Sequence, residues 1–283
     1  MVLWESGYVE ANGLKLHYRR SGRDSGLPPL VTAHGISDDG GCWIPIAEEF
    51  VAQFDVILAD ARGHGRSEAP QDNDYGATAQ GRDLLGLIAA LGLRRPFILG
   101  HSMGAVTALA AAGMAPDVPA AIMVEDPPPR LVGADGDTPS NPNDFADMRA
   151  WLGQMKRMTR DELLDYGKVR SPTWPDAEFP HWADAKAHMS PNVQMLLDPA
   201  NRQVIDWPPL LRAISCPALL ITADPELGAI TTPDAAARMN AMILQLTITH
   251  VPGAGHNIRR EQPALYLEAI RAFLANLPAA ARP

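Results

Sequence analysis

Ile98-Leu99-Gly100-His101-Ser102-Met103-Gly104 carries the strongest structural signal in this chain. It contains the pattern Gly-x-Ser-x-Gly, and an alanine-rich run, residues 105–110, follows it. An apolar run that leads into a helix-forming run predicts a strand turning sharply into a helix, and glycine tolerates the backbone of such a turn. The turn would expose the hydroxyl of Ser102 at the start of the helix. Because serine alone is a poor nucleophile, this placement predicts a histidine base and a carboxylate elsewhere in the chain.

His256 is the candidate base. It lies in the sequence Gly253-Ala254-Gly255-His256, directly after the last apolar run of the chain. A glycine-containing loop at the carboxyl end of a strand can bring an imidazole to Ser102. The chain order, with the histidine last, is the order expected after a serine on a strand-to-helix turn.

Four carboxylates are candidates for the third catalytic group, which would orient the imidazole. Asp224 is favoured, because it follows the strand before His256 and gives the order serine, acid, histidine. Glu226 lies two residues farther along the same loop. Glu125 and Asp126 end an earlier strand, and a neighbouring strand end can reach the same imidazole.

Two backbone N–H groups are predicted to form an oxyanion hole. Met103 directly follows the nucleophile, and Ile36 follows His34-Gly35 at the end of another apolar run. These are the two places that supply the donors when a serine lies on this kind of turn.

Apolar strands alternate with helical patterns along most of the chain. This alternation predicts the α/β class, with a mostly parallel, twisted sheet covered by helices on both faces. The alternation is suspended over residues 127–210, which are rich in Pro, Met, Trp and Asp. We expect this segment to be a helical lid over the carboxyl ends of the strands, where ligands bind in such sheets. The core would then comprise residues 1–126 and 211–283.

Tryptophans near the predicted site indicate an apolar pocket. Trp43 lies in the loop after Ile36, and Trp151 and Trp182 lie in the predicted lid. Aromatic rings supply broad apolar contact area, so these three residues are candidate substrate contacts.

Composition limits the classes of partner. The chain has 283 residues and a formal net charge of −9, which argues against a nucleic-acid binder. No apolar run is long enough to span a bilayer, and the first residues lack the pattern of a secretory signal. The two cysteines have no metal-ligand spacing. We therefore expect a cytoplasmic protein that acts on a small molecule without metal, cofactor or membrane; a homodimer is compatible with the sequence.

Taken together, these pieces resemble the α/β-hydrolase fold superfamily. The matching segments are His34-Gly35, Asp60 to Ser67, Gly100 to Gly104 and Gly253 to His256. The resemblance implies a serine hydrolase of the esterase or lactonase type with an inserted lid. One departure concerns the acid, because the residues around Asp224 lack the Gly-x-x-Asp spacing that many members carry. Some lactonases of the superfamily use a glutamate after the sixth strand, and Glu125 is similar in position.

The predicted function is therefore hydrolysis of a carboxylic ester or lactone of an apolar small molecule through an acyl-enzyme. Two alternatives stay open. The same catalytic groups could hydrolyse a carbon–carbon bond in a dicarbonyl product of ring cleavage. A ligand receptor built on this fold would carry the same groups with slow or no turnover.

Overall fold

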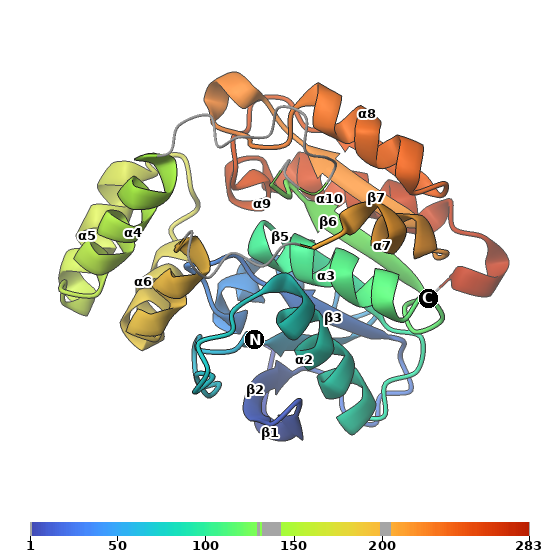
Figure 1. Ribbon diagram of the computed structural model, residues 1–283, viewed down its shortest axis with the longest axis horizontal. Coiled ribbons are helices and arrows are strands. Elements are labelled where there is room, and N and C mark those ends of the chain that lie inside the picture. The colour runs from blue at the N-terminus through green and yellow to red at the C-terminus, as the bar shows by residue number, and fades with distance from the viewer. Residues whose placement is uncertain (1, 129–130, 132–142, 199–204, 283) are drawn as a thin grey trace.

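The computed structural model describes residues 2–128, 131, 143–198 and 205–282 (Figure 1). One eight-stranded sheet has the strand order β1-β2-β4-β3-β5-β6-β7-β8. Only the pairings of β1 with β2 and of β2 with β4 are antiparallel; all other neighbours run parallel. The strands are β1 (Glu5–Ala11), β2 (Leu14–Arg20), β3 (Pro29–Ala33), β4 (Asp55–Ala59), β5 (Phe97–His101), β6 (Ala121–Glu125), β7 (Ala218–Thr222) and β8 (Leu246–His250). The predicted α/β class and mostly parallel sheet are confirmed.

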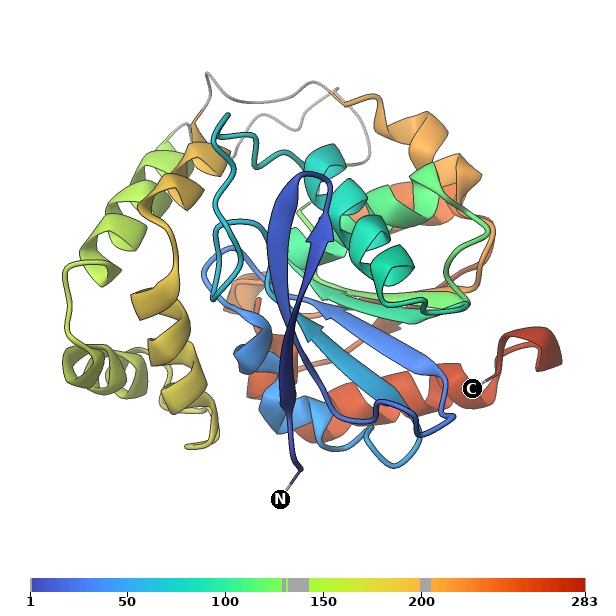
Figure 2. The ribbon, with the colours of Figure 1, turned by 90° about the horizontal axis from the view of Figure 1, so that it is seen from below.

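Helices cover both faces of this sheet (Figure 2). Helices α2, α3, α7 and α8 pack against one face, and α1, α9 and α10 pack against the other. The helices are α1 (Ile44–Ala47), α2 (Ala77–Ala90), α3 (Met103–Met114), α4 (Asn143–Met155), α5 (Arg160–Arg170), α6 (Glu178–His188), α7 (Trp207–Ala213), α8 (Pro233–Met242), α9 (Ile258–Glu261) and α10 (Pro263–Ala275). Short 3-10 helices are η1 (Gly40–Trp43), η3 (Pro191–Leu197), η5 (Pro225–Leu227) and η6 (Ala279–Ala281).

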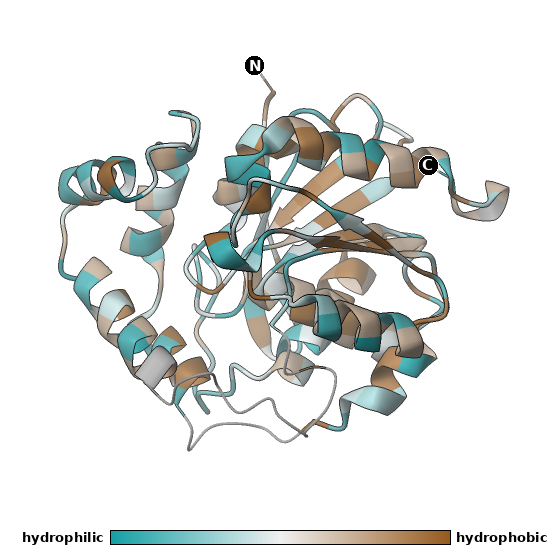
Figure 3. Cartoon of the chain, turned by 90° about the horizontal axis from the view of Figure 1, so that it is seen from above, coloured by the Kyte–Doolittle hydropathy of each residue, from teal (hydrophilic) through white to brown (hydrophobic). Residues whose placement is uncertain are grey.

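The inner strands are apolar along their whole length because both of their faces are covered. Every residue of β4, β5, β6 and β7 is buried. Figure 3 shows these strands as largely apolar ribbons between the helical layers. A sheet buried on both faces lacks the alternation of polar and apolar residues that a half-exposed sheet shows. The edge strand β8 is mostly half-exposed or exposed.

A tight hairpin of β1 and β2 forms the other edge of the sheet. Asn12 and Gly13 both have positive φ, 49° and 76°, which is the backbone of a two-residue turn of type I′. The side chain of Asn12 also donates to Asp83 of α2, over 2.8 Å. The turn therefore both reverses the chain and ties the hairpin to the helical layer.

Helices α4, α5 and α6 form a separate layer beside the carboxyl ends of the parallel strands (Figures 1 and 2). This layer, which we call the cap, has its own apolar cluster that includes Leu163 and Trp182. Helix α7 packs on α3 of the core, so residue 210, the expected end of the lid, lies inside a core helix. The expected lid also includes residues 129–130, 132–142 and 199–204, which are outside the described residues.

The described residues contain neither a membrane-spanning helix nor a metal-binding cluster. None of their helices is both long and apolar enough to cross a bilayer. No group of three or more histidine, cysteine or acidic side chains among them could hold a metal ion.

Candidate active site

Ser102 lies on a strained turn between β5 and α3. Its φ of 53° and ψ of −113° are rare for a residue with a side chain, and such strain clusters at functional sites. The flanking glycines make the turn possible. A Cβ on Gly100 would overlap the carbonyl group of Gly104, and a Cβ on Gly104 would overlap the carbonyl group of Ala33. Glycine at both positions therefore allows the close backbone contacts of the turn on which Ser102 lies, between β5 and α3.

His256 is held by Asp126. The Nδ1 atom of the imidazole lies 2.7 Å from Oδ2 of Asp126, whose carboxylate is fully buried. The same carboxylate accepts the backbone N–H groups of Ile230 and Thr231, over 2.9 and 2.8 Å. Asp126 itself has a φ of 44°, so it is a second strained residue at this end of the sheet. A carboxylate fixed by two backbone donors presents a rigid acceptor to the imidazole.

The structure corrects the expectation that Asp224 is the partner of His256. Its carboxylate instead accepts from the backbone N–H of Gly253, over 2.7 Å, and lies 2.8 Å from Nε2 of His250. These contacts fix the start of the loop that carries His256, rather than the imidazole. Glu226 is exposed in η5, one residue beyond Pro225.

Glu125, the other alternative, also bonds to a different group. Its Oε1 accepts the backbone N–H of Arg259, over 3.0 Å, and its Oε2 lies 3.4 Å from Nη1 of the same arginine. Burial raises the pKa of Glu125, and Arg259 opposes that shift. Glu125 therefore anchors the backbone three residues after His256. Of the four candidate acids, only Asp126 is bonded to the imidazole.

His101 connects the serine turn with the loop that carries the base. Its Nε2 lies 2.9 Å from the carbonyl oxygen of His256, and the two rings are 4.8 Å apart. Burial, together with the charges of Arg259 and His256, holds the pKa of His101 well below its usual range. The neutral imidazole donates from Nε2 to the carbonyl oxygen of His256. Because His101 directly precedes Ser102, this bond holds the backbone of His256 close to the serine turn.

The two predicted oxyanion donors lie around the same turn. Met103 is the first residue of α3, where backbone N–H groups have no partner within the helix. Ile36 lies in a turn closed by a bond from Asp38 N–H to the carbonyl oxygen of Gly35, over 3.0 Å. A Cβ on Gly35 would lie 3.7 Å from Cβ of Ser102, so this turn is adjacent to the nucleophile.

His64 supports the turn that contains Ile36. Its Nε2 lies 2.8 Å from the carbonyl oxygen of Ile36, and its Nδ1 lies 2.9 Å from that of Arg62. Burial, with a contribution from His34, lowers the pKa of His64 to about 4. At neutral pH this histidine is therefore uncharged and acts as a structural donor.

A cluster of buried charges, which we call the Asp38 cluster, lies directly behind these loops. Sequence reasoning did not identify it; the one available signal is the Arg259-Arg260 pair soon after His256. Asp38 lies 3.0 Å from each of Lys186, Arg259 and Arg260. Arg260 also lies 2.9 Å from Glu178, and Arg259 lies 3.4 Å from Glu125. All six side chains are at most 4% exposed. The cluster connects the loop after β3, the end of β6, the start of α9 and the cap helix α6.

The structure corrects two of the three expected substrate contacts. Trp43 is fully buried in the core, with the guanidinium of Arg259 4.4 Å from its ring centre. Trp182 is 5% exposed and packs inside the cap, 4.3 Å from Nζ of Lys186. Trp151 is half-buried and packs against two apolar clusters, one inside the cap and one between cap and core, so its role stays a prediction.

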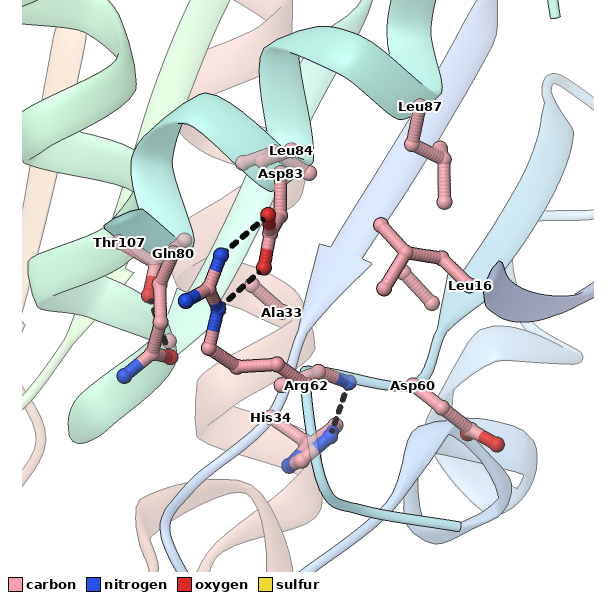
Figure 4. A pocket seen from close by; sticks show the side chains of 13 residues that line it. Leu16, Ala33, His34, Asp60, Arg62, Gln80, Asp83, Leu84, Leu87 and Thr107 are labelled. Carbon is pink, nitrogen blue, oxygen red and sulfur yellow. Dashed lines mark hydrogen bonds and ion pairs between the residues drawn. The ribbon is translucent and has the colours of Figure 1, made fainter. Parts of the chain in front are cut away.

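A small cavity lies behind the turn that carries Ser102 (Figure 4). It has a volume of about 30 Å³ and borders Gly104, Thr107 and the buried Arg62–Asp83 ion pair. This volume holds about one water molecule, so the cavity is not a substrate site. The ion pair ties the loop after β4 to α2, with two contacts of 2.6 Å.

Comparisons with known proteins agree with the fold. The sequence profile of the alpha/beta hydrolase family matches residues 30–269. An N-formylmaleamate deformylase from Pseudomonas putida is 31% identical over 255 residues, which is 89% of this chain and 90% of that protein. A 2-(acetamidomethylene)succinate hydrolase from Mesorhizobium japonicum is 24% identical over 258 residues, with 89% and 90% covered. The crystal structure of an N-formylmaleamic acid deformylase from Pseudomonas putida S16 superposes with a TM-score of 0.77, at 26% identity, and covers 94% of this chain and all of that one.

The fold and these relatives define a hydrolase. The chain belongs to the alpha/beta hydrolase family.

Proposed function

We propose that this protein is a serine hydrolase that cleaves a carboxylic ester or lactone of an apolar small molecule. Ser102 is the nucleophile, His256 the general base and Asp126 the carboxylate that orients it. The observation that carries the proposal is the 2.7 Å contact between His256 and a buried, strained Asp126, on loops that meet beside the turn of Ser102.

The reaction follows from these positions. Asp126 accepts a hydrogen bond from Nδ1–H of His256, which leaves the Nε2 lone pair free to take the proton of the Ser102 hydroxyl. The serine oxygen attacks the carbonyl carbon, and the N–H groups of Met103 and Ile36 stabilise the negative charge on the carbonyl oxygen. His256 then returns the proton to the leaving alcohol, and water hydrolyses the acyl-enzyme by the same route.

An apolar cluster between cap and core supports an apolar substrate. Ile36, the proposed oxyanion residue, packs against this cluster and is itself only partly buried. The buried members of the cluster are Tyr75, Leu152, Met189, Val193 and Leu197. The nearby cations Lys186, Arg259 and Arg260 already have carboxylate partners. The described surroundings of Ile36 thus favour an uncharged group over a carboxylate.

Replacement of the nucleophile tests this proposal. Ser102→Ala should lower turnover of p-nitrophenyl butyrate by about 10⁵-fold or more, because both acylation and its base-assisted proton transfer are lost. Ser215→Ala, at an exposed serine between α7 and β7, is the matched control and should leave turnover unchanged. Undiminished turnover by a folded Ser102→Ala protein would rule out Ser102 as the nucleophile.

The relatives favour a second candidate, hydrolysis of an N-acyl bond. The names of two similar proteins describe a deformylase acting on N-formylmaleamate and a hydrolase acting on 2-(acetamidomethylene)succinate. The same serine, base and oxyanion donors would serve acyl transfer from nitrogen. Comparing kcat/KM for N-formylmaleamate with that for p-nitrophenyl butyrate decides between the two, and the higher value identifies the substrate class.

A further inference from the structure

We infer that Asp38 is a positioning residue, which holds the oxyanion turn, the loop of His256 and the cap helix α6 in one arrangement. The inference rests on the proposed function, because the loops that it concerns are those that would carry the reaction.

Asp38 connects the two catalytic loops through one carboxylate. Its own N–H closes the turn that contains Ile36, two residues before it. Its Oδ2 accepts from Nη2 of Arg259 and from Nη2 of Arg260, at 3.0 Å each. These arginines follow His256 by three and four residues. A displacement of Asp38 would therefore move the oxyanion donor and the base relative to each other.

The cap is attached to the same carboxylate. Oδ1 of Asp38 accepts from Nζ of Lys186, over 3.0 Å, and Lys186 is fully buried. Glu178, on the same helix, accepts from Nε of Arg260 over 2.9 Å. Two ion pairs thus join α6 to the residues that position the catalytic loops.

The charge of Asp38 is essential to this arrangement. Burial alone would raise the pKa of Asp38, but Arg260, Lys186 and Arg259 hold it well below its usual range. Asp38 is therefore ionised at neutral pH. Without it, three buried cations would face only Glu125 and Glu178, and unpaired buried charges are strongly unfavourable.

Asp38→Asn separates positioning from simple stability. It should lower kcat for p-nitrophenyl butyrate by about 100-fold, because a small misplacement of catalytic groups has an effect of that size. KM should change by less than about threefold, since the substrate contacts remain. Asp38→Glu restores the charge and should return kcat toward the wild-type value, which Asp38→Asn should not do.

The cap helix offers a matched control. Asp184 of α6 forms an exposed ion pair with Arg160, and Asp184→Asn should leave kcat and KM within about threefold of wild type. The inference is overturned by an unchanged kcat in folded Asp38→Asn, or by a loss of kcat/KM that arises from KM alone. If Asp38→Asn does not fold, Lys186→Met decides, with a decrease in kcat of at least about tenfold expected; wild-type kinetics in that variant count against the role.

Failure of the proposed function is distinguishable from failure of this inference. Absence of ester turnover by the wild-type protein would count against the proposed function only. The role of Asp38 is then tested by hydrogen exchange of the backbone amides of residues 35–38 and 256–260, compared between Asp38→Asn and the wild-type protein. Exchange should accelerate by at least about tenfold in Asp38→Asn, because opening of these loops becomes easier; equal exchange would overturn the role.

An independent observation concerns the N-terminal hairpin, which carries a second chain of serine, histidine and aspartate. Oγ of Ser6 lies 2.7 Å from Nε2 of His17, and Nδ1 of His17 lies 2.7 Å from Oδ2 of Asp60. The side chains of His17 and Asp60 are fully buried, whereas Ser6 is exposed on the edge strand β1.

Asp60 orients the imidazole of His17. Burial would raise the pKa of Asp60, but the bonds from His17 and from the N–H of Arg66 lower it. The carboxylate accepts a hydrogen bond from Nδ1–H of His17, so Nε2 of the same imidazole faces the hydroxyl of Ser6 as an acceptor. Arg19 lies opposite Ser6 in the pairing of β1 with β2, with Nη1 3.6 Å from Asp60 Oδ1, and adds positive charge nearby.

We propose that Ser6 is a second nucleophile, which accepts one phosphonyl group from a fluorophosphonate. The oxygen of Ser6 forms a bond to phosphorus, the phosphorus–fluorine bond breaks and fluoride leaves. The hydroxyl proton passes to Nε2 of His17 and then to water. The product is a stable phosphonyl ester on Ser6, formed once per molecule.

Labelling of the Ser102→Ala protein tests this site, because the first nucleophile is then absent. Peptide mass spectrometry should find the adduct on Ser6 at least about tenfold faster than on Ser25 or Ser215, since general-base assistance accelerates proton transfer by at least that factor. Both comparison serines are exposed. His17→Gln should abolish the advantage of Ser6, and Ser6→Ala alone should leave ester turnover unchanged. The proposal is overturned if Ser6 in the Ser102→Ala protein is labelled no faster than Ser25 and Ser215. This comparison does not need the His17→Gln variant, so it decides the question even if that variant does not fold.

Discussion

At the scale of single residues, the site depends on where backbone strain is tolerated. Ser102 and Asp126 both adopt positive φ, and each lies at the carboxyl end of one of two adjacent strands, β5 and β6. Such conformations are unfavourable unless their surroundings hold them. Here the N–H of Ser102 donates to the carbonyl oxygen of Glu125, the residue before Asp126, over 3.0 Å. One backbone bond thus fixes the nucleophile relative to the carboxylate that orients the base.

Asp126→Asn should lower kcat for p-nitrophenyl butyrate by about 10³- to 10⁴-fold, because an amide does not hold the imidazole in the required tautomer. Asp224→Asn is the matched control, since its contacts are to His250 and Gly253. Its kcat should stay within about threefold of wild type, as expected for a partly exposed pair. Steady-state kinetics of both variants measure the difference. A larger loss in Asp224→Asn than in Asp126→Asn would reverse the assignment.

At the scale of elements, the cap has local stabilisation that does not depend on the sheet. Helix α5 begins with a capping box, in which Thr159 accepts from the N–H of Glu162 and Glu162 accepts from the N–H of Thr159. Helices α5 and α6 then pack around Leu163, Trp182 and Ala183. The cap reaches the core through the Asp38 cluster and through a bond from Ser190 N–H to the carbonyl oxygen of Gly63, over 2.8 Å. Such local stability allows the cap to behave as a unit.

Thr159→Ala should lower the free energy of unfolding of the cap by about 1 kcal/mol, the usual effect of losing an N-cap side chain. Hydrogen exchange of residues 160–170 measures this local effect. Thr173→Ala, at an exposed position in the following loop, should leave exchange unchanged. Equal exchange in the two variants would show that the capping box does not stabilise α5.

At the scale of the whole molecule, buried titratable groups make stability depend on pH. His64, with a pKa of about 4 in the folded protein, and His101, with its pKa well below the usual range, are neutral when buried. The unfolded chain binds protons at these histidines near pH 6.5. Between these two values the unfolded state therefore binds more protons, and the free energy of unfolding decreases as pH falls. Glu125, whose pKa is raised by burial, acts in the opposite direction.

The contribution of His64 to this loss is about 3 kcal/mol when the pH has fallen from about 6.5 to about 4. Urea unfolding at a series of pH values across this window measures it. His64→Gln removes the titrating group, so the decrease in the free energy of unfolding should become shallower in that variant. An equally steep decrease in both proteins would show that His64 does not titrate in this window.

Local patterns in the sequence were enough to predict the fold, the turn that carries Ser102 and the loop that carries His256. Strand β3 ends directly before His34-Gly35, where the apolar run was expected to end, because such a run is stable inside a sheet that is covered on both faces. The turn at Ser102 was identifiable because Gly100 and Gly104 are required by close backbone contacts. His256 was identifiable from its glycine loop after the last strand. These are local patterns, and local sterics fix them.

Which of these groups come into contact depends on how the loops and the cap pack. Asp126 and Asp224 both follow inner strands, so their spacing along the chain does not show which of them is the partner of His256. The packing of the loop after β8 brings the imidazole into contact with Asp126. Trp43 and Trp182 looked like pocket residues, but cations of the Asp38 cluster lie against both rings. The cluster itself joins residues up to 222 positions apart. Such contacts depend on how loops and cap pack in three dimensions, and no periodicity in the sequence encodes them.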